Sequence, residues 1–395
     1  MKVLMINKYL YTVGGCENYM FFLSEKLEKE GHEVQFFGLR STKNVVGNEY
    51  NIYVTSFEDK RIANPFSLIY NQSAKNKLIK LLRLYKPDIV HLNNIYYHLT
   101  TSIIDACKKE KIPVVMTVHD SQLICPNHML YRFKEDVVCE ECVKAKKDFK
   151  PCLKYRCHKD SLLKSYLVTL EGRMTHSKRK YDYVSKFICP SLFLKSKLVN
   201  GGYDESKLVV KHNFLLSAKQ KTIPNKEDYV LFFGRLSEEK GISLLLKAMP
   251  KNIHLIIAGT GPLENYVKEH LEQNMEYVGY KSGAELKDLI AKAKFTIYPS
   301  KWYENCPLSV IESIYYCSPV IAAGMGGNLE LIDNCVTGLF YENNNSLDLS
   351  EKISYLYNNE VLLKEMYNNC LSYNKTPTID EYYDMIISLY KEIID

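Results

Sequence analysis

The sequence predicts an α/β protein made of two Rossmann-like domains, each a doubly wound parallel sheet with helices on both faces. Short apolar runs alternate with amphipathic segments from one end of the chain to the other, and this alternation is typical of parallel sheets whose crossover connections are helices. The runs form two groups, and each group is large enough for a sheet of its own. At 395 residues, the chain is also long enough to bury two hydrophobic cores.

The first group of predicted strands belongs to a domain over residues 1–212. Its strands are Lys2–Ile6, Glu33–Gly38, Asp88–Leu92, Pro113–Val118 and Phe187–Pro190. The second group belongs to a domain over residues 213–376, with strands at Tyr229–Phe233, His254–Ala258, Phe295–Tyr298 and Pro319–Ala322. The polar segment Ser217–Asp228 contains Pro224 and is the expected linker.

The last segment, residues 377–395, is predicted to form a helix. Within Ile379–Ile394, apolar side chains recur at a helical spacing, at Tyr382, Ile386, Leu389 and Tyr390. A helix with one apolar stripe buries that stripe against another part of the protein.

The composition is that of a soluble globular protein, with 46% apolar and 25% charged residues. No apolar run approaches the roughly 18 residues of a membrane-spanning helix. The apolar stretch Val3–Ile6 is followed by Asn7 and Lys8, so it is too short for a signal peptide. Twelve cysteines without a secretory signal favour reduced thiols and a cytoplasmic protein.

Positive charge is concentrated between Lys144 and Lys180, where twelve Lys or Arg residues accompany only three acidic ones. Two interpretations stay open: a solvated helix face, or a surface that meets an anionic partner. Apolar residues are interleaved with the basic ones at Leu162, Leu163 and Tyr166. Such a mixture suits peripheral contact with an anionic membrane at the inner face of the cell.

The most informative stretch is Glu304–Glu312. Its two carboxylates bracket a turn that ends at Pro307 and the first turns of an apolar helix. Glu304 therefore belongs to a loop and Glu312 to the helix that follows. This layout suits one small polar molecule held at two points.

A matching cationic segment, Gly234–Gly241, directly follows the strand Tyr229–Phe233. The Arg235 guanidinium can bind two phosphate oxygens, and Lys240 adds a point charge. Together the acids and the bases predict a site for a sugar nucleotide, with Arg235 and Lys240 stabilising the departing diphosphate. With two protein cations in place, we expect no cofactor and no divalent metal for catalysis.

These two motifs resemble the donor-binding half of retaining GT-B glycosyltransferases of family 4, the group 1 sequences. The E-x7-E signature of that family is met by Glu304 and Glu312, and its G-R-x(4-5)-K-G signature by Gly234, Arg235, Lys240 and Gly241. Where many members have Gly-Phe-Gly after the first acid, this chain has Asn305-Cys306-Pro307, followed by Leu308. That variant also occurs in the family, so it marks a subgroup.

The resemblance implies the fold and a division of labour. It implies a GT-B fold with an interdomain cleft, an N-terminal domain that binds the acceptor, a C-terminal domain that binds the donor, and a last helix that returns to the N-terminal domain. It also implies that Glu312 accepts hydrogen bonds from the ribose and that Glu304 holds hydroxyls of the donor sugar. The anomeric configuration should be retained, by front-face attack assisted by the leaving phosphate.

Other candidate residues follow predicted strands, where α/β proteins bind ligands. Gly14 and Gly15 precede a helix that begins near Cys16, and the backbone there can approach an anion. Gly261 ends a strand and opens a helix, and the resemblance places Tyr280 beside the nucleotide base. The loop Gly324–Asn328 is expected near Glu304.

Two histidines follow or end strands of the first domain. The resemblance implies that His119 reaches the donor sugar, with Asp120 as a neighbour that orients it. For His91–Asn94, lining of the acceptor side and capping of the next helix stay open. Tyr9, Tyr11, Tyr96 and Tyr97 are candidates to stack on acceptor sugar rings.

A cysteine-rich insert spans residues 120–160, approximately. Five cysteines, Cys125, Cys139, Cys142, Cys152 and Cys157, include one C-x2-C pair. Their density is that of a structural zinc site, and free thiols are the alternative.

We therefore expect a glycosyltransferase that moves a sugar from a nucleotide-sugar, UDP-linked, to a hydroxyl of a saccharide or lipid-linked saccharide in surface polysaccharide synthesis. A UDP-sugar epimerase of the same fold is an alternative, distinguished by release of free UDP. A nucleic-acid-binding zinc-knot protein is a remote one, because it leaves Glu304, Glu312 and Gly234–Gly241 without a purpose.

Overall fold

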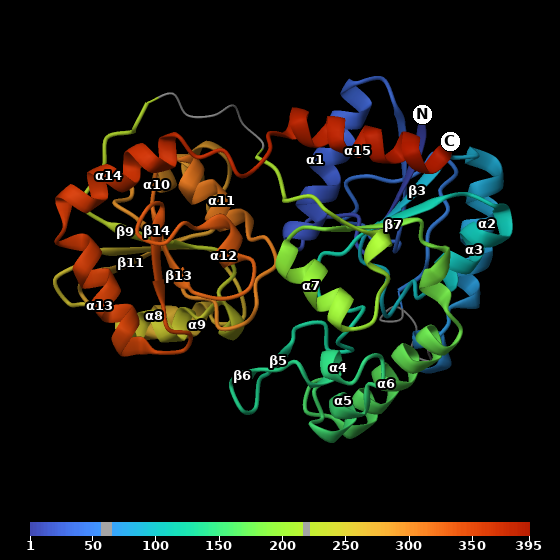
Figure 1. The fold of residues 1–395 in the computed structure, drawn as a ribbon, viewed down its shortest axis with the longest axis horizontal. Helices are drawn as coiled ribbons and strands as arrows, with labels where there is room; N and C mark the ends of the chain where they lie inside the picture. Colours follow the sequence, from blue (N-terminus) through green and yellow to red (C-terminus); the bar gives the residue numbers. More distant parts are fainter. Residues whose placement is uncertain (57–64, 216–221) are drawn as a thin grey trace. The chain divides into compact units, whose positions relative to one another are not determined.

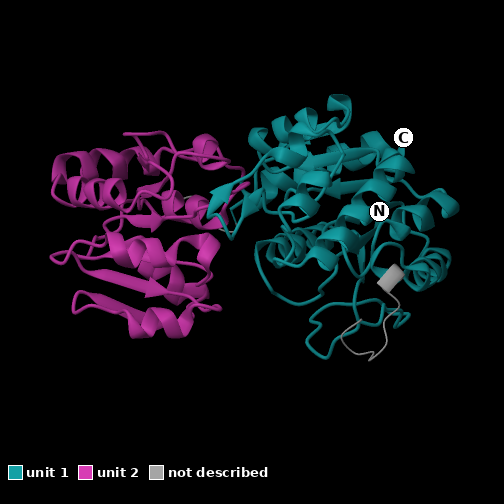
Figure 2. Cartoon of the chain, turned by 90° about the horizontal axis from the view of Figure 1, so that it is seen from below, with its two compact units in different colours: residues 1–216, 378–395 teal, residues 217–377 magenta. Residues whose placement is uncertain are grey.

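A computed structural model describes residues 1–56, 65–215 and 222–395, and the chain divides into two compact units (Figure 2). Unit 1 comprises residues 1–216 and 378–395, and unit 2 comprises residues 217–377. Each unit contains one six-stranded sheet (Figure 1). The predicted α/β class with two parallel sheets is confirmed. The start of the predicted linker, residues 217–221, lies outside the described residues.

The sheet of unit 1 is parallel throughout, in the order β2-β1-β3-β4-β7-β8. Its strands are β1 Lys2–Ile6, β2 Glu33–Phe37, β3 Ile89–Leu92, β4 Val114–Thr117, β7 Lys186–Cys189 and β8 Leu208–Val210. Every residue of β3 and β4 is buried, as expected for central strands covered on both faces. Strand β8 was not predicted, because three residues give too short an apolar run.

The helices of unit 1 connect these strands. They are α1 Gly15–Lys29, α2 Gln72–Tyr85, α3 Ser102–Glu110, α6 Leu162–Ser177, α7 Leu192–Asn200 and α15 Ile379–Ile394, with short 3-10 turns at Pro65–Leu68, Lys180–Tyr183 and Glu205–Lys207. The first turn of α2 is fixed by Asn71, whose side chain accepts a hydrogen bond from the Ala74 N–H.

Helix α15 packs on α1 within unit 1, so the expected return of the last helix to the first domain is confirmed. Thr378 and Glu381 form a capping box at its start. The apolar stripe predicted from the sequence is the buried one, since Tyr382, Ile386 and Tyr390 are fully enclosed.

The cysteine-rich insert has little regular structure. Its elements are the two-residue antiparallel strands β5 Tyr131–Arg132 and β6 Val137–Val138, and the short helices α4 Glu141–Lys144 and α5 Lys150–Lys154. Its small core contains Cys142, Phe149, Cys152 and Val168, so α6 supplies part of the support.

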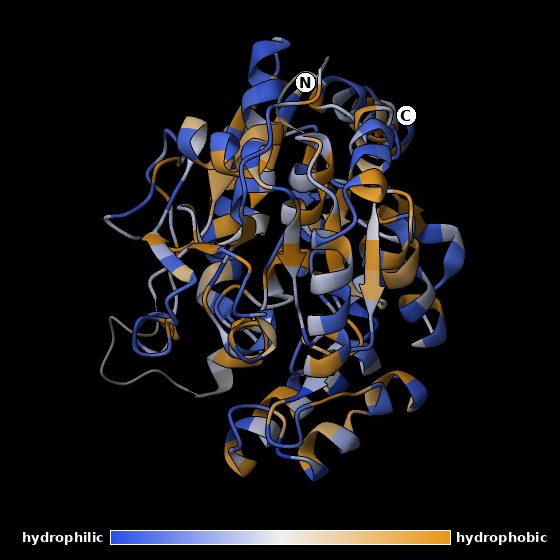
Figure 3. Cartoon of the chain, turned by 90° about the vertical axis from the view of Figure 1, so that its left-hand side faces the viewer, coloured by the Kyte–Doolittle hydropathy of each residue, from blue (hydrophilic) through white to orange (hydrophobic). Residues whose placement is uncertain are grey.

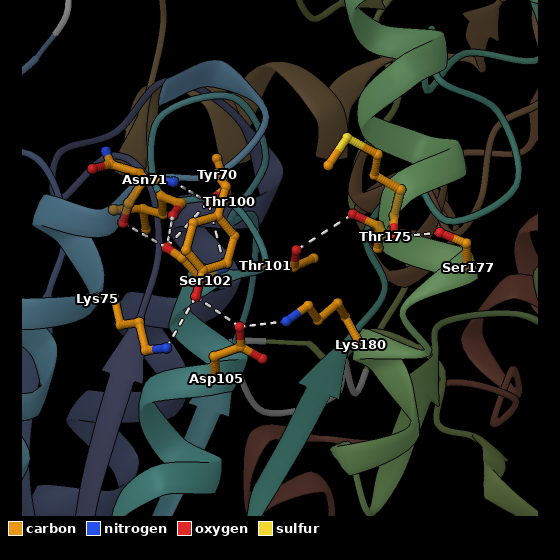
Figure 4. A network of polar contacts seen from close by, with 12 residues as sticks. Tyr70, Asn71, Lys75, Thr100, Thr101, Ser102, Asp105, Thr175, Ser177 and Lys180 are labelled. Carbon is orange, nitrogen blue, oxygen red and sulfur yellow. Dashed lines mark hydrogen bonds and ion pairs between the residues drawn. The ribbon is translucent and has the colours of Figure 1, made fainter. Parts of the chain in front are cut away.

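A polar network ties the segments around α3 and α6 together (Figure 4). Asp105 accepts hydrogen bonds from Lys180 (2.5 Å) and from the Tyr70 hydroxyl (2.7 Å). Burial raises the pKa of Asp105, but these two donors outweigh burial and hold the pKa below its usual value. Thr101 and Thr175 add a contact between the start of α3 and α6.

The sheet of unit 2 is also parallel, in the order β11-β10-β9-β12-β13-β14. Its strands are β9 Val230–Phe233, β10 Leu255–Ala258, β11 Met275–Gly279, β12 Thr296–Tyr298, β13 Val320–Ala323 and β14 Gly338–Tyr341. The two edge strands β11 and β14 were not predicted. Strand β11 is only half-buried beyond Met275, and β14 begins with a glycine, so neither gives a clear apolar run.

The helices of unit 2 lie between and after these strands. They are α8 Ile242–Ala248, α9 Glu264–Glu269, α10 Gly283–Lys292, α11 Leu308–Tyr315, α12 Asn328–Leu331, α13 Ser346–Tyr357 and α14 Glu360–Leu371, with a 3-10 turn at Glu238–Lys240. Several strands are apolar along their length, whereas the helices carry both polar and apolar faces (Figure 3). None of the helices in the described part of the chain is long and apolar enough to span a membrane.

Candidate active site

Glu304 lies in the loop after β12 and receives three hydrogen bonds on one oxygen. Lys240 Nζ, the Ser300 hydroxyl and the Trp302 indole N–H donate to its Oε1 over 2.7, 2.6 and 2.6 Å. The carboxylate is 7% exposed. Its orientation is therefore fixed before any ligand binds, as a binding group requires.

The ion pair between Lys240 and Glu304 is strong because it is largely removed from water. Burial raises the pKa of Glu304, but the Lys240 charge and the three hydrogen bonds outweigh burial and hold the pKa below its usual value. For Lys240, burial lowers the pKa, but the Glu304 charge outweighs burial and holds the pKa above its usual value. Both groups are therefore charged at neutral pH. The Tyr298 hydroxyl accepts a further bond from Lys240 over 2.9 Å.

Two glycines let three loops of unit 2 approach one another. Gly241 has a left-handed φ of 71°, and a Cβ there would lie 1.9 Å from the Pro299 carbonyl oxygen. A Cβ on Gly327 would lie 1.6 Å from the Asn305 carbonyl oxygen, and its N–H bonds the Glu304 carbonyl over 2.7 Å. Only glycine fits at either position. The expected closeness of the Gly324–Asn328 loop to Glu304 is confirmed.

Glu312 lies in the second turn of α11, which begins at Leu308 after Pro307. It is half-buried, and its carboxylate has no hydrogen-bond or ion-pair partner among the described residues. Burial raises its pKa to about 7, although Lys287 acts in the opposite direction. Hydroxyl groups of a ligand that donate hydrogen bonds to this unpaired, half-buried carboxylate would stabilise its charged form. Asn305 and the buried Cys306 lie in the turn between the two acids.

The other predicted donor residues also follow neighbouring strands of unit 2. Arg235, after β9, is exposed and has no hydrogen-bond or ion-pair partner among the described residues. Gly234 beside it has open space where a Cβ would be. After β10, Gly261 lies against the Leu236 backbone, and Tyr280 after β11 is 68% exposed. The loops of β9, β10, β11 and β12 thus gather these groups at one edge of the sheet.

In unit 1, His119 follows β4 and is held by Asn93. Its Nε2 lies 2.8 Å from Asn93 Oδ1, and its ring contacts the Tyr19 ring edge-on at 4.9 Å between centroids. Burial lowers the pKa of His119 to about 3, so the ring is neutral at pH 7. Asp120 instead accepts a hydrogen bond from Tyr96 over 2.9 Å.

Two other expectations for unit 1 have different outcomes. His91 does not line an acceptor surface, because it lies inside β3 and is fully buried. Gly14 and Gly15 do open α1 in an exposed position, but the Gly14 N–H already donates to the Glu17 carboxylate over 3.0 Å. The Glu17 carboxylate thus occupies the Gly14 N–H, one of the backbone groups expected to approach an anion.

A lysine that the sequence reasoning did not single out lies among the predicted aromatic residues. Lys8 Nζ is 4.7 Å from the ring centroids of both Tyr9 and Tyr96, and 5.7 Å from that of Tyr97. Lys8 follows β1 and the two latter tyrosines follow β3, so neighbouring strands bring them together. No spacing in the sequence indicates this cation–π cluster.

The five cysteines of the insert, Cys125, Cys139, Cys142, Cys152 and Cys157, line one small cavity as free thiols. The structure thus brings together the residues that the sequence grouped. However, among residues 1–56, 65–215 and 222–395, no three His, Cys, Asp or Glu side chains have an arrangement that would hold a metal ion. The thiols therefore share one cavity without the spacing of a bound metal ion.

Two family models match consecutive parts of the chain. The model described as "Glycosyltransferase Family 4" matches residues 13–215, and that described as "Glycosyl transferases group 1" matches residues 215–376. The chain belongs to glycosyltransferase family 4. The expectation from the two donor motifs is confirmed, and the fold is GT-B.

Individual relatives and a solved structure agree with this family assignment. An uncharacterised glycosyltransferase of Methanocaldococcus jannaschii is 24% identical over 83% of this chain and 81% of its own. A Campylobacter jejuni α-1,4-N-acetyl-D-galactosaminyltransferase, named for a diNAcBac-PP-undecaprenol-linked substrate, is 28% identical over 42% of this chain and 49% of its own. The Anabaena protein HepE, solved with UDP and glucose, has a TM-score of 0.69 and 16% identity, covering 99% of this chain and all of that one.

Proposed function

We propose that this glycosyltransferase moves a sugar from a UDP-sugar to a hydroxyl of a saccharide acceptor. The observation that carries the proposal is the ion pair of Lys240 with Glu304, with Arg235 in the loop after β9 and Glu312 in the helix that follows Glu304. These residues supply two cations that can bind a diphosphate and two carboxylates that can bind hydroxyls. HepE, of similar fold, has been solved with UDP and glucose, which supports the choice of nucleotide.

Each residue has a distinct role in the proposed reaction. Arg235 and Lys240 neutralise the charge that builds on the diphosphate as the glycosidic bond breaks. Glu312 accepts hydrogen bonds from the ribose, and Glu304 binds hydroxyls of the sugar. His119, neutral because it is buried, contacts the donor sugar near the reacting carbon. These groups stabilise the charge without a divalent metal, and the acceptor attacks from the same face, so the anomeric configuration is retained.

The acceptor is proposed to be a saccharide linked to a lipid at the inner face of the cell membrane. The Campylobacter jejuni relative is named for an undecaprenol-linked saccharide substrate. The first turns of α6 expose Leu162, Leu163 and Tyr166, and the basic Lys144–Lys180 segment surrounds them in the sequence. This combination suits an anionic lipid surface, and surface polysaccharide synthesis is the process that such a substrate serves.

A structural zinc ion in the insert is a second proposal, and its support is that all five cysteines line one small cavity. Purified protein, never exposed to chelators, is analysed for metals. About one zinc per chain supports a structural site, and clean protein without zinc removes the idea in favour of free thiols.

A screen of nucleotide-sugars tests the function. The correct donor raises the thermal midpoint of the protein, and with an acceptor it yields free UDP and a longer saccharide. An epimerase would convert the donor sugar without releasing UDP as a final product. That alternative is not favoured, because the relatives are named as glycosyltransferases. Absence of stabilisation by every UDP-sugar would contradict the proposed donor.

A further inference from the structure

A buried chain of hydrogen bonds runs from the C-terminal helix into the sheet of unit 1 and back. The Tyr390 hydroxyl meets His91 Nδ1 at 2.5 Å, and His91 Nε2 meets Thr117 Oγ1 at 2.7 Å. Thr117 then meets the Tyr19 hydroxyl at 3.1 Å, and Tyr19 meets the Tyr382 hydroxyl at 2.8 Å. All five side chains are at most 2% exposed, so water does not replace any of these partners.

Both ends of this chain are tyrosines of α15. Tyr382 and Tyr390 are eight positions apart, about two turns, and so lie on the same helix face. Burial lowers the pKa of His91 to about 3, so its ring is neutral, with one nitrogen that donates and one that accepts. Without the two hydroxyls of α15, His91 and Tyr19 would each lose a buried hydrogen-bond partner. An unpaired polar group in the interior lowers the stability of the folded protein.

Residues of this hydrogen-bond chain, or close to them in sequence, contact His119 on two sides. Thr117 is two residues before His119 on the same strand end, and the Tyr19 ring contacts the His119 ring directly. Asn93, which holds His119 Nε2, comes two residues after His91. The groups that fix His119 are thus attached to the residues that α15 holds in place.

We propose that Tyr382 and Tyr390 are positioning residues, which set the orientation of His119 through Tyr19, Thr117 and His91. This inference rests on the proposed contact of His119 with the donor sugar. Helix α15 begins at Ile379, directly after unit 2 ends at residue 377. Catalysis therefore depends on a helix that is continuous in sequence with the unit carrying the donor residues.

The test uses the full-length enzyme with Tyr382→Phe and Tyr390→Phe, singly and together. Phenylalanine keeps the ring and removes only the hydroxyl. Tyr383→Phe is the matched control. Tyr383 belongs to the same helix, but its hydroxyl bonds His32 Nε2 (2.9 Å), which is not part of the buried hydrogen-bond chain. We measure kcat, donor KM, UDP affinity by calorimetry and, with labelled histidine, the nitrogen resonances of His119.

The double variant should lose about 10-fold or more in kcat, shift the His119 resonances and keep its UDP affinity, while Tyr383→Phe changes none of these. A folded double variant with wild-type kcat and unshifted resonances overturns the inference. His119→Ala separates the two hypotheses. If it lowers kcat while the double variant does not, only the positioning role fails, and if it leaves kcat unchanged, the proposed role of His119 fails as well.

Discussion

Lys240 Nζ and Glu304 Oε1 form a 2.7 Å ion pair that joins the loop after β9 to the loop after β12. The two residues are 64 positions apart, yet β9 and β12 are neighbours in the sheet. The pair therefore links the cationic motif of the donor site directly to the acidic motif. Its consequence is that a change in either motif alters the other.

Trp302 should be necessary for full activity because its indole N–H donates to Glu304 Oε1. Trp302→Phe keeps an aromatic ring and removes the donor, so the orientation of Glu304 is less fixed. We expect kcat to fall about 10-fold, since one hydrogen bond to a charged group contributes about 1.5–3 kcal/mol. The exposed Tyr355→Phe in α13 is the control. Equal kcat for Trp302→Phe and wild type would contradict the role of Glu304.

Trp302 is also the chain's only tryptophan, so its fluorescence reports on the donor site. Titration with UDP-sugar should change the emission of the wild type. The same titration of Lys240→Ala should require a higher donor concentration, because a diphosphate-binding charge is absent. Unchanged emission at saturating donor would place the ligand away from Glu304.

Donor binding should depend on pH through Glu312. Its pKa, raised to about 7 by burial, means that the carboxyl is largely protonated at pH 6 and ionised at pH 8. The ionised form accepts two hydroxyl donors better, so donor KM should fall as pH rises across this range. In Glu312→Gln that trend should disappear and KM should be higher at pH 8. A pH profile shared by both enzymes would assign the titration to another group.

Asp105 should contribute to the stability of unit 1 through Lys180 and Tyr70 (Figure 4). Both ion-pair partners are 18% exposed, so screening by water is limited. Because the folded pKa lies below the unfolded one, this stabilisation is present above about pH 4 and is lost as pH falls through the folded pKa. Asp105→Asn should lower the free energy of unfolding by about 1–3 kcal/mol at pH 7, and less at acid pH.

The control for that measurement is Glu25→Gln. Glu25 pairs with Lys29 on the exposed face of α1, with both side chains more than half exposed, and such pairs contribute little. A loss of stability equal for the two variants would show that the Asp105 network has no special role.

The exposed start of α6 should bind anionic vesicles. Leu162→Ser with Leu163→Ser removes the apolar contact while the surrounding charge stays. Co-sedimentation with phosphatidylserine vesicles should fall several-fold, whereas Leu347→Ser in α13, at a leucine that is even more exposed, leaves it unchanged. Binding by the wild type that is independent of salt and of anionic lipid would argue against a membrane partner.

The sequence allows most of the fold to be predicted, because periodic apolar runs determine it. Nine strands were placed within a residue or so of their observed bounds, and α15 was placed over Ile379–Ile394. The misses have a physical cause. Strand β11 is only partly enclosed, β8 has three residues, and β14 begins with a glycine, so none of them gives a clear apolar run.

Site residues that belong to a sequence motif can be predicted. Site residues that only the tertiary fold brings to the site cannot. Glu304 and Lys240 were each recognised from their own motif, but no spacing shows that Trp302 and Ser300 share the oxygen that Lys240 binds. His91 looked like a ligand-facing residue because it ends an apolar run, and only the packing of Tyr390 against it explains its burial. The cysteines were grouped correctly, but residue type did not determine their geometry.

The central claim is that cations of unit 2 stabilise a departing diphosphate, and Arg235 tests it most directly. Arg235 is exposed and without a partner among the described residues, so Arg235→Ala should leave the thermal midpoint unchanged. Under single-turnover conditions with saturating UDP-sugar, sugar transfer by this variant should be slower by about 100-fold, or about 2.7 kcal/mol. A transfer rate equal to that of the wild type would contradict the account.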